Sequence, residues 1–198
     1  MASFAGIWIQ AAGDPAAAAG RLRRLGRLHG EIREIHELRF ERGAGWLLAT
    51  VPGDSIPAAA RLVSRELSSV CVGLLMQSVA DCLGFWHYRG GREIRRLTYG
   101  FQEQGSWEEV SGSPEPWEEE LLWSTPAQDI LEYAPEEEHE RIRSILADRI
   151  LRPGAEVPPI DARSLAVGIL RFYDIPTVWP ERVKVGPPWP LRRLAAFW

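Results

Sequence analysis

The sequence is poor in the residues that build disulfide frameworks and metal centres. It has two cysteines, Cys71 and Cys82, each inside an apolar stretch, and four histidines, none at the spacing of a metal-binding pair. Cysteines in such stretches are typical of reduced core residues. The nearest approach to a metal cluster is Glu136 with His139 and Glu140, and an exposed acidic helix start explains it equally well. We therefore expect neither a disulfide nor a metal, and no other cofactor.

Long apolar runs are also missing. The longest clean one, residues 70–76, is far shorter than the roughly 20 residues that a membrane-spanning helix needs. The beginning of the sequence, MASFAGIWIQAAGD, has no basic leader and no proper hydrophobic segment, so it does not look like a secretion signal. These features predict a cytoplasmic protein without a membrane partner.

Motifs of reactive sites are equally scarce. No serine sits in a glycine elbow, neither cysteine has an adjacent base, and Gly90-Gly91 does not form a phosphate-binding fingerprint. Asp81 lies in the otherwise apolar passage QSVADCLGFW, where a carboxylate must find donors or a cation, and Arg96 or Thr98 could supply them. A structural ion pair explains Asp81 more simply than a catalytic acid does. The sequence therefore favours a protein without catalytic activity.

Basic residues are absent from one long stretch. From Thr98 to Glu140 the chain has no Lys or Arg, whereas the balance before Thr98 is basic and the whole chain has a net charge of -4. Such segregation can steer a charged partner, or it can pair the two halves of the molecule internally. Thirteen of the 27 acidic residues lie in this acidic tract, namely Glu103, Glu108, Glu109, Glu115, Glu118, Glu119, Glu120, Asp129, Glu132, Glu136, Glu137, Glu138 and Glu140.

The hydrophobic pattern predicts the order strand, helix, strand, strand, helix, strand in the first part of the chain. Two right-handed crossovers in this order put both helices on one face of a four-stranded antiparallel sheet. We therefore expect the α+β class with a ferredoxin-like βαββαβ core. Strands are expected at 4–10, 32–41, 46–51 and 70–76, and helices at 15–30 and 57–67.

An aromatic hairpin is expected next, in GFWHYRGGREIRRLTYGF (84–101), with Gly90-Gly91 as its two-residue turn. An unbroken register from that turn pairs Trp86 with Arg95 and Phe85 with Arg96. A guanidinium would then lie over an aromatic ring on each face, at about 0.5–1 kcal/mol if exposed.

Beyond the hairpin the pattern predicts a short strand at 106–110 and helices near 116–122, 135–151 and 161–173. We expect residues 1–112 to form the ferredoxin-like sheet with its hairpin extension. Residues 113–198 are expected to form a helical annex and a Pro/Trp-rich tail packed on that sheet, so that the chain is one compact unit.

Three of the nine tryptophans are spaced through the acidic tract. Tryptophan is a frequent hot-spot residue at interfaces, although core packing of the annex explains these three as well. The leading hypothesis is a non-catalytic intracellular protein-binding module, immunity-like or accessory, that presents an acidic Trp-bearing surface to a basic partner. The residues expected on this surface are Trp107, Glu108, Glu109, Trp117, Glu118, Glu119 and Trp123.

A second hypothesis remains open. A small-ligand-binding protein or an enzyme could have a pocket near Asp81 and His87, bordered by Trp86 and Arg95. Nucleic acid is disfavoured as a partner, because the aromatic pattern of the RNA-binding sheets is absent and the chain is acidic. The sequence does not indicate an oligomeric state.

The passage QSVADCLGFWHYRGGREIRRLTYG, with GSWEEVSGSPEPWEEE after it, resembles small bacterial proteins of uncharacterised function. They share a QSVxD strand, an aromatic GFxxYxxG hairpin ending in RxLxYG, and a GxPEPWE segment. The likeness covers about residues 77–120, roughly a quarter of the chain. It implies a bacterial origin and a shared fold, but no activity. The matching positions are Ser78, Val79, Asp81, Phe85, Gly91, Arg95 or Arg96, Leu97, Pro114, Pro116, Trp117 and Glu118.

Overall fold

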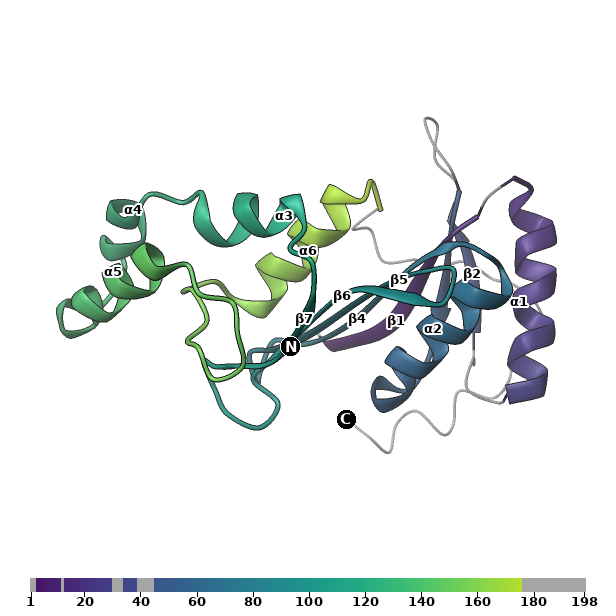
Figure 1. Cartoon of the computed structure of the whole chain (residues 1–198), viewed down its shortest axis with the longest axis horizontal. Coiled ribbons are helices and arrows are strands. Elements are labelled where there is room, and N and C mark those ends of the chain that lie inside the picture. Colours follow the sequence, from purple (N-terminus) through teal and green to yellow (C-terminus); the bar gives the residue numbers. More distant parts are fainter. Residues whose placement is uncertain (1–2, 12, 30–33, 39–44, 176–198) are drawn as a thin grey trace.

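A computed structural model describes residues 3–11, 13–29, 34–38 and 45–175 of the 198-residue chain, with the backbone alone for 3–4, 27–29 and 34–38. The predicted tail lies outside these residues. The order of strands and helices predicted for the first part of the chain is confirmed (Figure 1). Its elements are β1 (Ser3–Gln10), α1 (Pro15–His29), β2 (Glu34–Leu38), β3 (Trp46–Thr50), η1 (Gly53–Ser55), α2 (Ile56–Glu66) and β4 (Val70–Gln77).

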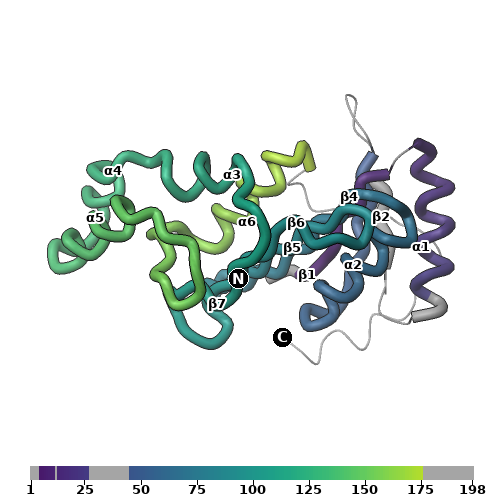
Figure 2. The backbone as a smooth tube through the Cα atoms, viewed as in Figure 1, coloured from purple at the N-terminus to yellow at the C-terminus, as the bar shows by residue number. Residues whose placement is uncertain are grey.

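Three further strands extend the sheet, β5 (Cys82–Arg89), β6 (Arg92–Tyr99) and β7 (Trp107–Gly112). The seven strands of the described residues lie in the order β2-β3-β1-β4-β5-β6-β7, and every neighbouring pair is antiparallel. The tube in Figure 2 shows this sheet running through the middle of the molecule, with helices on both sides. The expected α+β class is confirmed.

The two faces of the sheet bury separate cores, because side chains alternate along each strand. In β1, Ile7 and Ile9 point to the face that α1 and α2 cover, whereas Trp8 points to the opposite face. The opposite face is covered by helices from the second half of the chain, chiefly α6 (Ala162–Phe172) with the short α3 (Pro116–Glu118) and η2 (Glu119–Trp123). The sheet is therefore the middle layer of three.

The remaining helices are α4 (Ala127–Leu131), η3 (Glu136–Glu138) and α5 (His139–Asp148). They lie at the end of the molecule opposite α1 (Figure 1). The helix expected at 135–151 is shorter than predicted, because residues 136–138 form a 3-10 turn and Arg149 adopts a left-handed conformation with φ of 48° that ends α5. No helix in the described part of the chain is both long and apolar enough to cross a membrane.

The expected hairpin forms, but its register differs from the prediction. Tyr88 pairs with Glu93 as expected, and a bulge between His87 and Tyr88 then shifts the pairing by one residue. Trp86 therefore lies opposite Arg96, and His87 lies opposite Arg95. Because a one-residue shift moves side chains to the other face, the predicted stacking of Arg95 on Trp86 is wrong. Arg95 and His87 instead share the face that α3 and α6 cover.

Glycines make room for Trp86 on the α2 face of the sheet. A Cβ atom at Gly84 would lie 2.6 Å from Cζ3 of the Trp86 ring, and closer still to Cη2. The indole therefore lies flat over the backbone of its own strand, 5% exposed. In this position Trp86 lines a groove between η1 and the loop that joins β6 to β7.

Candidate functional site

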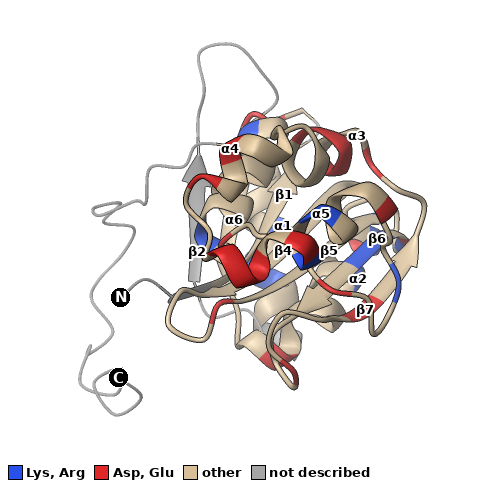
Figure 3. Cartoon of the chain, turned by 90° about the vertical axis from the view of Figure 1, so that its left-hand side faces the viewer, with Lys and Arg blue, Asp and Glu red and all other residues tan. Residues whose placement is uncertain are grey.

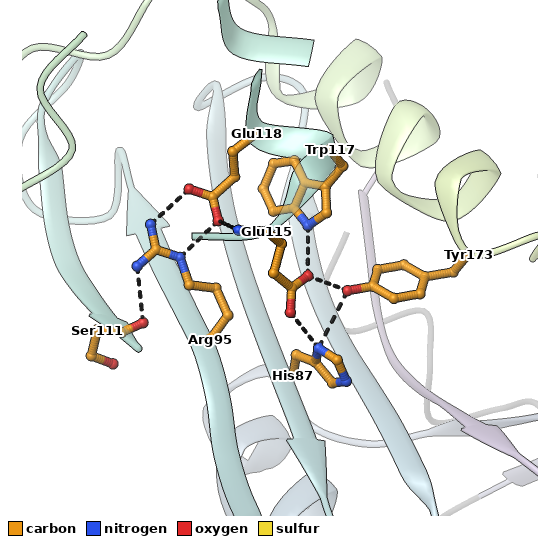
Figure 4. A network of polar contacts seen from close by, with 7 residues as sticks. All are labelled: His87, Arg95, Ser111, Glu115, Trp117, Glu118 and Tyr173. Atoms are coloured by element: carbon orange, nitrogen blue, oxygen red, sulfur yellow. Dashed lines mark hydrogen bonds and ion pairs between the residues drawn. The ribbon is translucent and has the colours of Figure 1, made fainter. Parts of the chain in front are cut away.

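A buried ion pair joins β6 to the start of α3. The guanidinium of Arg95 donates from Nε to Oε1 of Glu118 at 2.8 Å and from Nη2 to Oε2 at 2.7 Å. Its Nη1 donates to the backbone oxygens of Ser111 and Gly112. Glu118 also accepts the backbone N–H of Glu115, as the N3 residue of a capping box. Both charges are thus fully supplied with partners, as buried charges require (Figure 4).

Beside this pair lies a second buried carboxylate, Glu115. Its Oε1 is 2.5 Å from Nδ1 of His87. Its Oε2 accepts hydrogen bonds from Nε1 of Trp117, at 2.8 Å, and from the hydroxyl of Tyr173. Figure 4 shows the three donors converging on Glu115 from β5, α3 and the end of α6. The contact with a carboxylate means that Nδ1 of His87 carries the proton.

These contacts set the protonation of the carboxylate. Burial alone would raise the pKa of Glu115, but hydrogen bonds from His87, Tyr173 and Trp117 outweigh it, so the pKa lies below its usual value. Burial, and then the charge of Glu115, raise the pKa of Tyr173. Glu115 is therefore ionised and Tyr173 is a neutral donor at neutral pH.

The arrangement resembles half of a base dyad, since Glu115 orients His87 through Nδ1. However, His87 is 5% exposed, and its Nε2 is buried with no hydrogen-bond partner in the described part of the chain. With Nε2 closed off from solvent, the imidazole cannot reach a substrate in this conformation. The network of Figure 4 instead joins the sheet to α3 and α6.

The pocket residues of the second hypothesis are not brought together. His87 and Arg95 are neighbours, but Trp86 lies on the other face of the sheet. Asp81 is exposed, in the turn between β4 and β5, and its Oδ1 accepts the backbone N–H of Ala162 at 2.7 Å. It therefore binds the start of α6, rather than Arg96 or Thr98.

A groove of about 630 Å³ lies on another part of the surface, between η1 and the loop that joins β6 to β7. We call it the acidic groove. Its apolar walls come from Leu75, Trp86, Phe101 and Trp107. A groove of this size is large enough for a few side chains of a ligand. Trp86 and Trp107 are 5% and 1% exposed, and neither indole Nε1 has a hydrogen-bond partner in the described part of the chain.

Four carboxylates border the acidic groove, from Asp54, Glu103, Glu108 and Glu109. Glu109 is paired with Arg96 at 3.2 Å. Glu108 accepts backbone N–H groups of the loop, from Gln102 and from Glu103. Within the described ranges, Asp54, Glu103 and Glu108 have no ion pair, and no Lys or Arg lines the groove. The groove therefore carries uncompensated negative charge.

The structure separates the predicted binding residues, with Glu119 in an exposed pair with Arg149 and the other six in two groups. Trp107, Glu108 and Glu109 line the acidic groove. Trp117, Glu118 and Trp123 do not lie on a surface, because they are 0%, 2% and 8% exposed in the core beneath α3 and η2. Trp107 is also buried, so the prediction of tryptophans exposed to a partner is wrong.

The acidic tract is partly paired within the molecule. Besides Glu118 and Glu109, Glu119 contacts Arg149 at 2.6 Å and Glu138 contacts Arg141 at 2.8 Å. Figure 3 shows acidic residues on the helices at the α4 and α5 end, with few basic ones among them. Among the residues described, no group of three or more His, Cys, Asp or Glu side chains is arranged to hold a metal ion.

Several important residues were not identified from the sequence. Glu115 and Tyr173 lie far apart in the chain, and both contact Nδ1 of His87. The Glu-Pro-Trp-Glu spacing at 115–118 is a signal for the capping box that holds Glu118. Asp54 and Phe101 join the acidic groove from separate loops, and no local pattern indicates that they meet.

No family model, curated protein or solved structure matches this chain. The resemblance of residues 77–120 to small bacterial proteins therefore stays a prediction.

Proposed function

We propose that the protein is a non-catalytic protein-binding module that holds a basic segment of its partner in the acidic groove. The observation that carries this proposal is the groove itself, in which Asp54, Glu103 and Glu108 have no ion pair among the described residues. Carboxylates around a concave site with apolar walls focus the electric field and raise the local concentration of cations. A basic partner fits this field.

The chemistry of the groove favours binding over catalysis. Its carboxylates lie at the border, and its walls combine apolar side chains with those of Thr98, Gln102 and Ser106. Nucleophile, base and oxyanion donors do not converge there among the lining residues. The histidine that could act as a base is enclosed in the network of Figure 4, where Glu115 and Tyr173 occupy its Nδ1 side.

The proposal keeps part of the surface expected from the sequence. Trp107, Glu108 and Glu109 stay in the binding site, Trp107 as a wall and the glutamates at the border. Phe101 and Asp54 are added to it. Glu119 lies outside the groove, in an exposed pair with Arg149 that contributes about 0–1 kcal/mol to stability.

We also propose that β1 to β4 with α1 and α2 form a ferredoxin-like unit. The strand order β2-β3-β1-β4, with antiparallel neighbours and both helices on one face, supports this assignment. A cytoplasmic location and an immunity-like or accessory role are part of the same proposal. The reduced state expected for Cys71 and Cys82, both free and buried, is consistent with that location.

Charge reversal tests the proposed function. The groove variant Asp54→Lys/Glu103→Lys/Glu108→Lys is compared with the distal variant Glu132→Lys/Glu136→Lys/Glu137→Lys, which changes the net charge equally at exposed positions. The partner is captured with the wild-type chain by cross-linking and identified by mass spectrometry. The proposal predicts a basic partner that the groove variant loses and the distal variant keeps. Equal capture by both variants, or equal loss, contradicts it.

A further inference from the structure

We infer that the residue which the partner inserts into the acidic groove is an arginine rather than a lysine. The inference rests on the proposed function, because it specifies what occupies the same groove. It starts from Phe101, which lines the groove and is 41% exposed. An aromatic side chain with this exposure, next to uncompensated carboxylates, can contact a bound cation through its ring.

The loop that carries Phe101 is fixed at both ends. Gly100 and Gly105 have φ angles of 78° and 75°, which other residues rarely adopt. A Cβ at Gly100 would lie 2.7 Å from the backbone oxygen of Asp81, so the chain passes close to the β4–β5 turn here. Glu108 accepts backbone N–H groups inside the loop. Phe101 and Glu103 are therefore held on one side of the groove, with Asp54 on the other.

A guanidinium suits this combination better than an ammonium does. It is planar, it stacks on aromatic faces, and its fork of N–H groups can bind a carboxylate with two hydrogen bonds. A guanidinium already contacts one carboxylate of the border, since Nη1 of Arg96 donates to Oε1 of Glu109 at 3.2 Å. The ammonium of lysine is a compact charge, so it would pair with the carboxylates but would not stack on the ring of Phe101.

The apolar part of the groove favours a peptide over a simple cation. Leu75 and Phe101 line the groove beside the carboxylates. Apolar surface is stabilised when other apolar surface covers it, so an occupant that brings aliphatic groups as well as charge is favoured. The side chain of arginine has an aliphatic stem below its charged head, whereas a metal ion brings charge alone.

The test uses four blocked Gly/Ser peptides that differ at two central positions, which are arginine, lysine, citrulline or glutamate. Their affinities for the full chain are measured by isothermal titration calorimetry at low salt and at 0.5 M salt. We expect the arginine peptide to bind about three- to tenfold more tightly than the lysine peptide. The citrulline and glutamate peptides should not bind measurably.

Two matched variants test whether the ring of Phe101 is the source of the preference for arginine over lysine. Phe101→Leu should reduce the arginine-to-lysine ratio to about one while binding stays salt-dependent. Phe172→Leu, at a phenylalanine that is 40% exposed in α6 and outside the groove, should leave the ratio unchanged. Circular dichroism and thermal unfolding confirm that both variants fold.

The outcomes separate the inference from the proposed function. Equal binding of the arginine and lysine peptides, with both lost in the groove variant, overturns the arginine preference and leaves the proposed function standing. A preference that survives Phe101→Leu also overturns the inference, because the ring would not be its source. If neither basic peptide binds, or if binding persists in the groove variant, the proposed function fails as well.

Discussion

Arg95 and Glu118 form a bidentate ion pair with 2% and 3% of their side chains exposed. The pair lies directly under the start of α3, and both partners use their remaining hydrogen-bonding capacity on the backbone. It therefore fixes the position of α3 on the sheet.

Removing one partner of this pair leaves the other charge buried. We expect Glu118→Leu and Arg95→Met each to lower the free energy of unfolding by about 3–5 kcal/mol. The double variant Arg95→Met/Glu118→Leu should lose clearly less than the sum of the single losses, because it leaves no unpaired charge. Urea unfolding of the four proteins measures this. Additive losses, or single losses below about 1 kcal/mol, would mean that Arg95 and Glu118 are not a buried pair shielded from water.

The pH dependence of stability follows from Glu115. Its pKa is lower in the folded chain than in the unfolded chain, so the unfolded state binds its proton first as pH falls. The stabilisation is therefore present above the unfolded pKa, near 4.5, and is lost as pH falls through the lower folded value.

We expect Glu115→Gln to remove part of this acid sensitivity. The stability difference between wild type and Glu115→Gln should be largest at pH 6–7 and should shrink below about pH 4.5. Guanidinium unfolding at a series of pH values checks it. A difference that stays constant from pH 7 to pH 3 would show that Glu115 is not held as the carboxylate.

The close packing of Trp86 over Gly84 predicts a specific overpacking effect. Gly84→Ala places a methyl group inside the volume of the indole ring, so we expect a loss of about 1–3 kcal/mol. The loss should be smaller in the background of Trp86→Leu, which removes the ring. A double-mutant cycle in thermal or urea unfolding measures the coupling, and independent effects at the two positions would contradict the packing.

Asp81 should contribute to stability by capping α6 and not by catalysis. Asp81→Ala removes the acceptor for the backbone N–H of Ala162 and places a poorly suited residue at a φ of 46°, so a loss of about 1 kcal/mol or more is expected. Asp81→Asn keeps an acceptor and tolerates this φ angle, so it should lose less. Faster amide hydrogen exchange in the first turn of α6 should accompany the Ala variant. Unchanged exchange there would argue against the cap.

Much of the sheet could be predicted because its strands are apolar runs separated by turn residues. The run 70–76 and the two-residue turn at Gly90-Gly91 are local signals, and both lie where the pattern placed them. The bulge at His87 could not be predicted, since it depends on packing across the whole sheet. Because of this bulge, Arg95 lies on the face of the sheet where Glu118 lies, and not opposite Trp86 as the unbroken register predicted.

The candidate site was harder to predict for the same reason. Glutamates of the acidic tract look alike in the sequence, yet Glu118 is buried and Glu119 is exposed, because successive residues of a helix point about 100° apart. Trp107 and Trp117 meet the core because the chain returns over the sheet after β7. The groove joins segments from 53–54 and 101–109, so only the fold brings its two sides together.

The position of binding can be measured directly by NMR. The ¹⁵N-labelled chain is titrated with the arginine peptide, and changes in chemical shift are mapped on the residues. The proposed function predicts the largest changes at the indole N–H signals of Trp86 and Trp107 and in the loop 100–106, and much smaller ones in α4 and α5. Changes centred on α4 and α5, with the two indole signals unmoved, would contradict it.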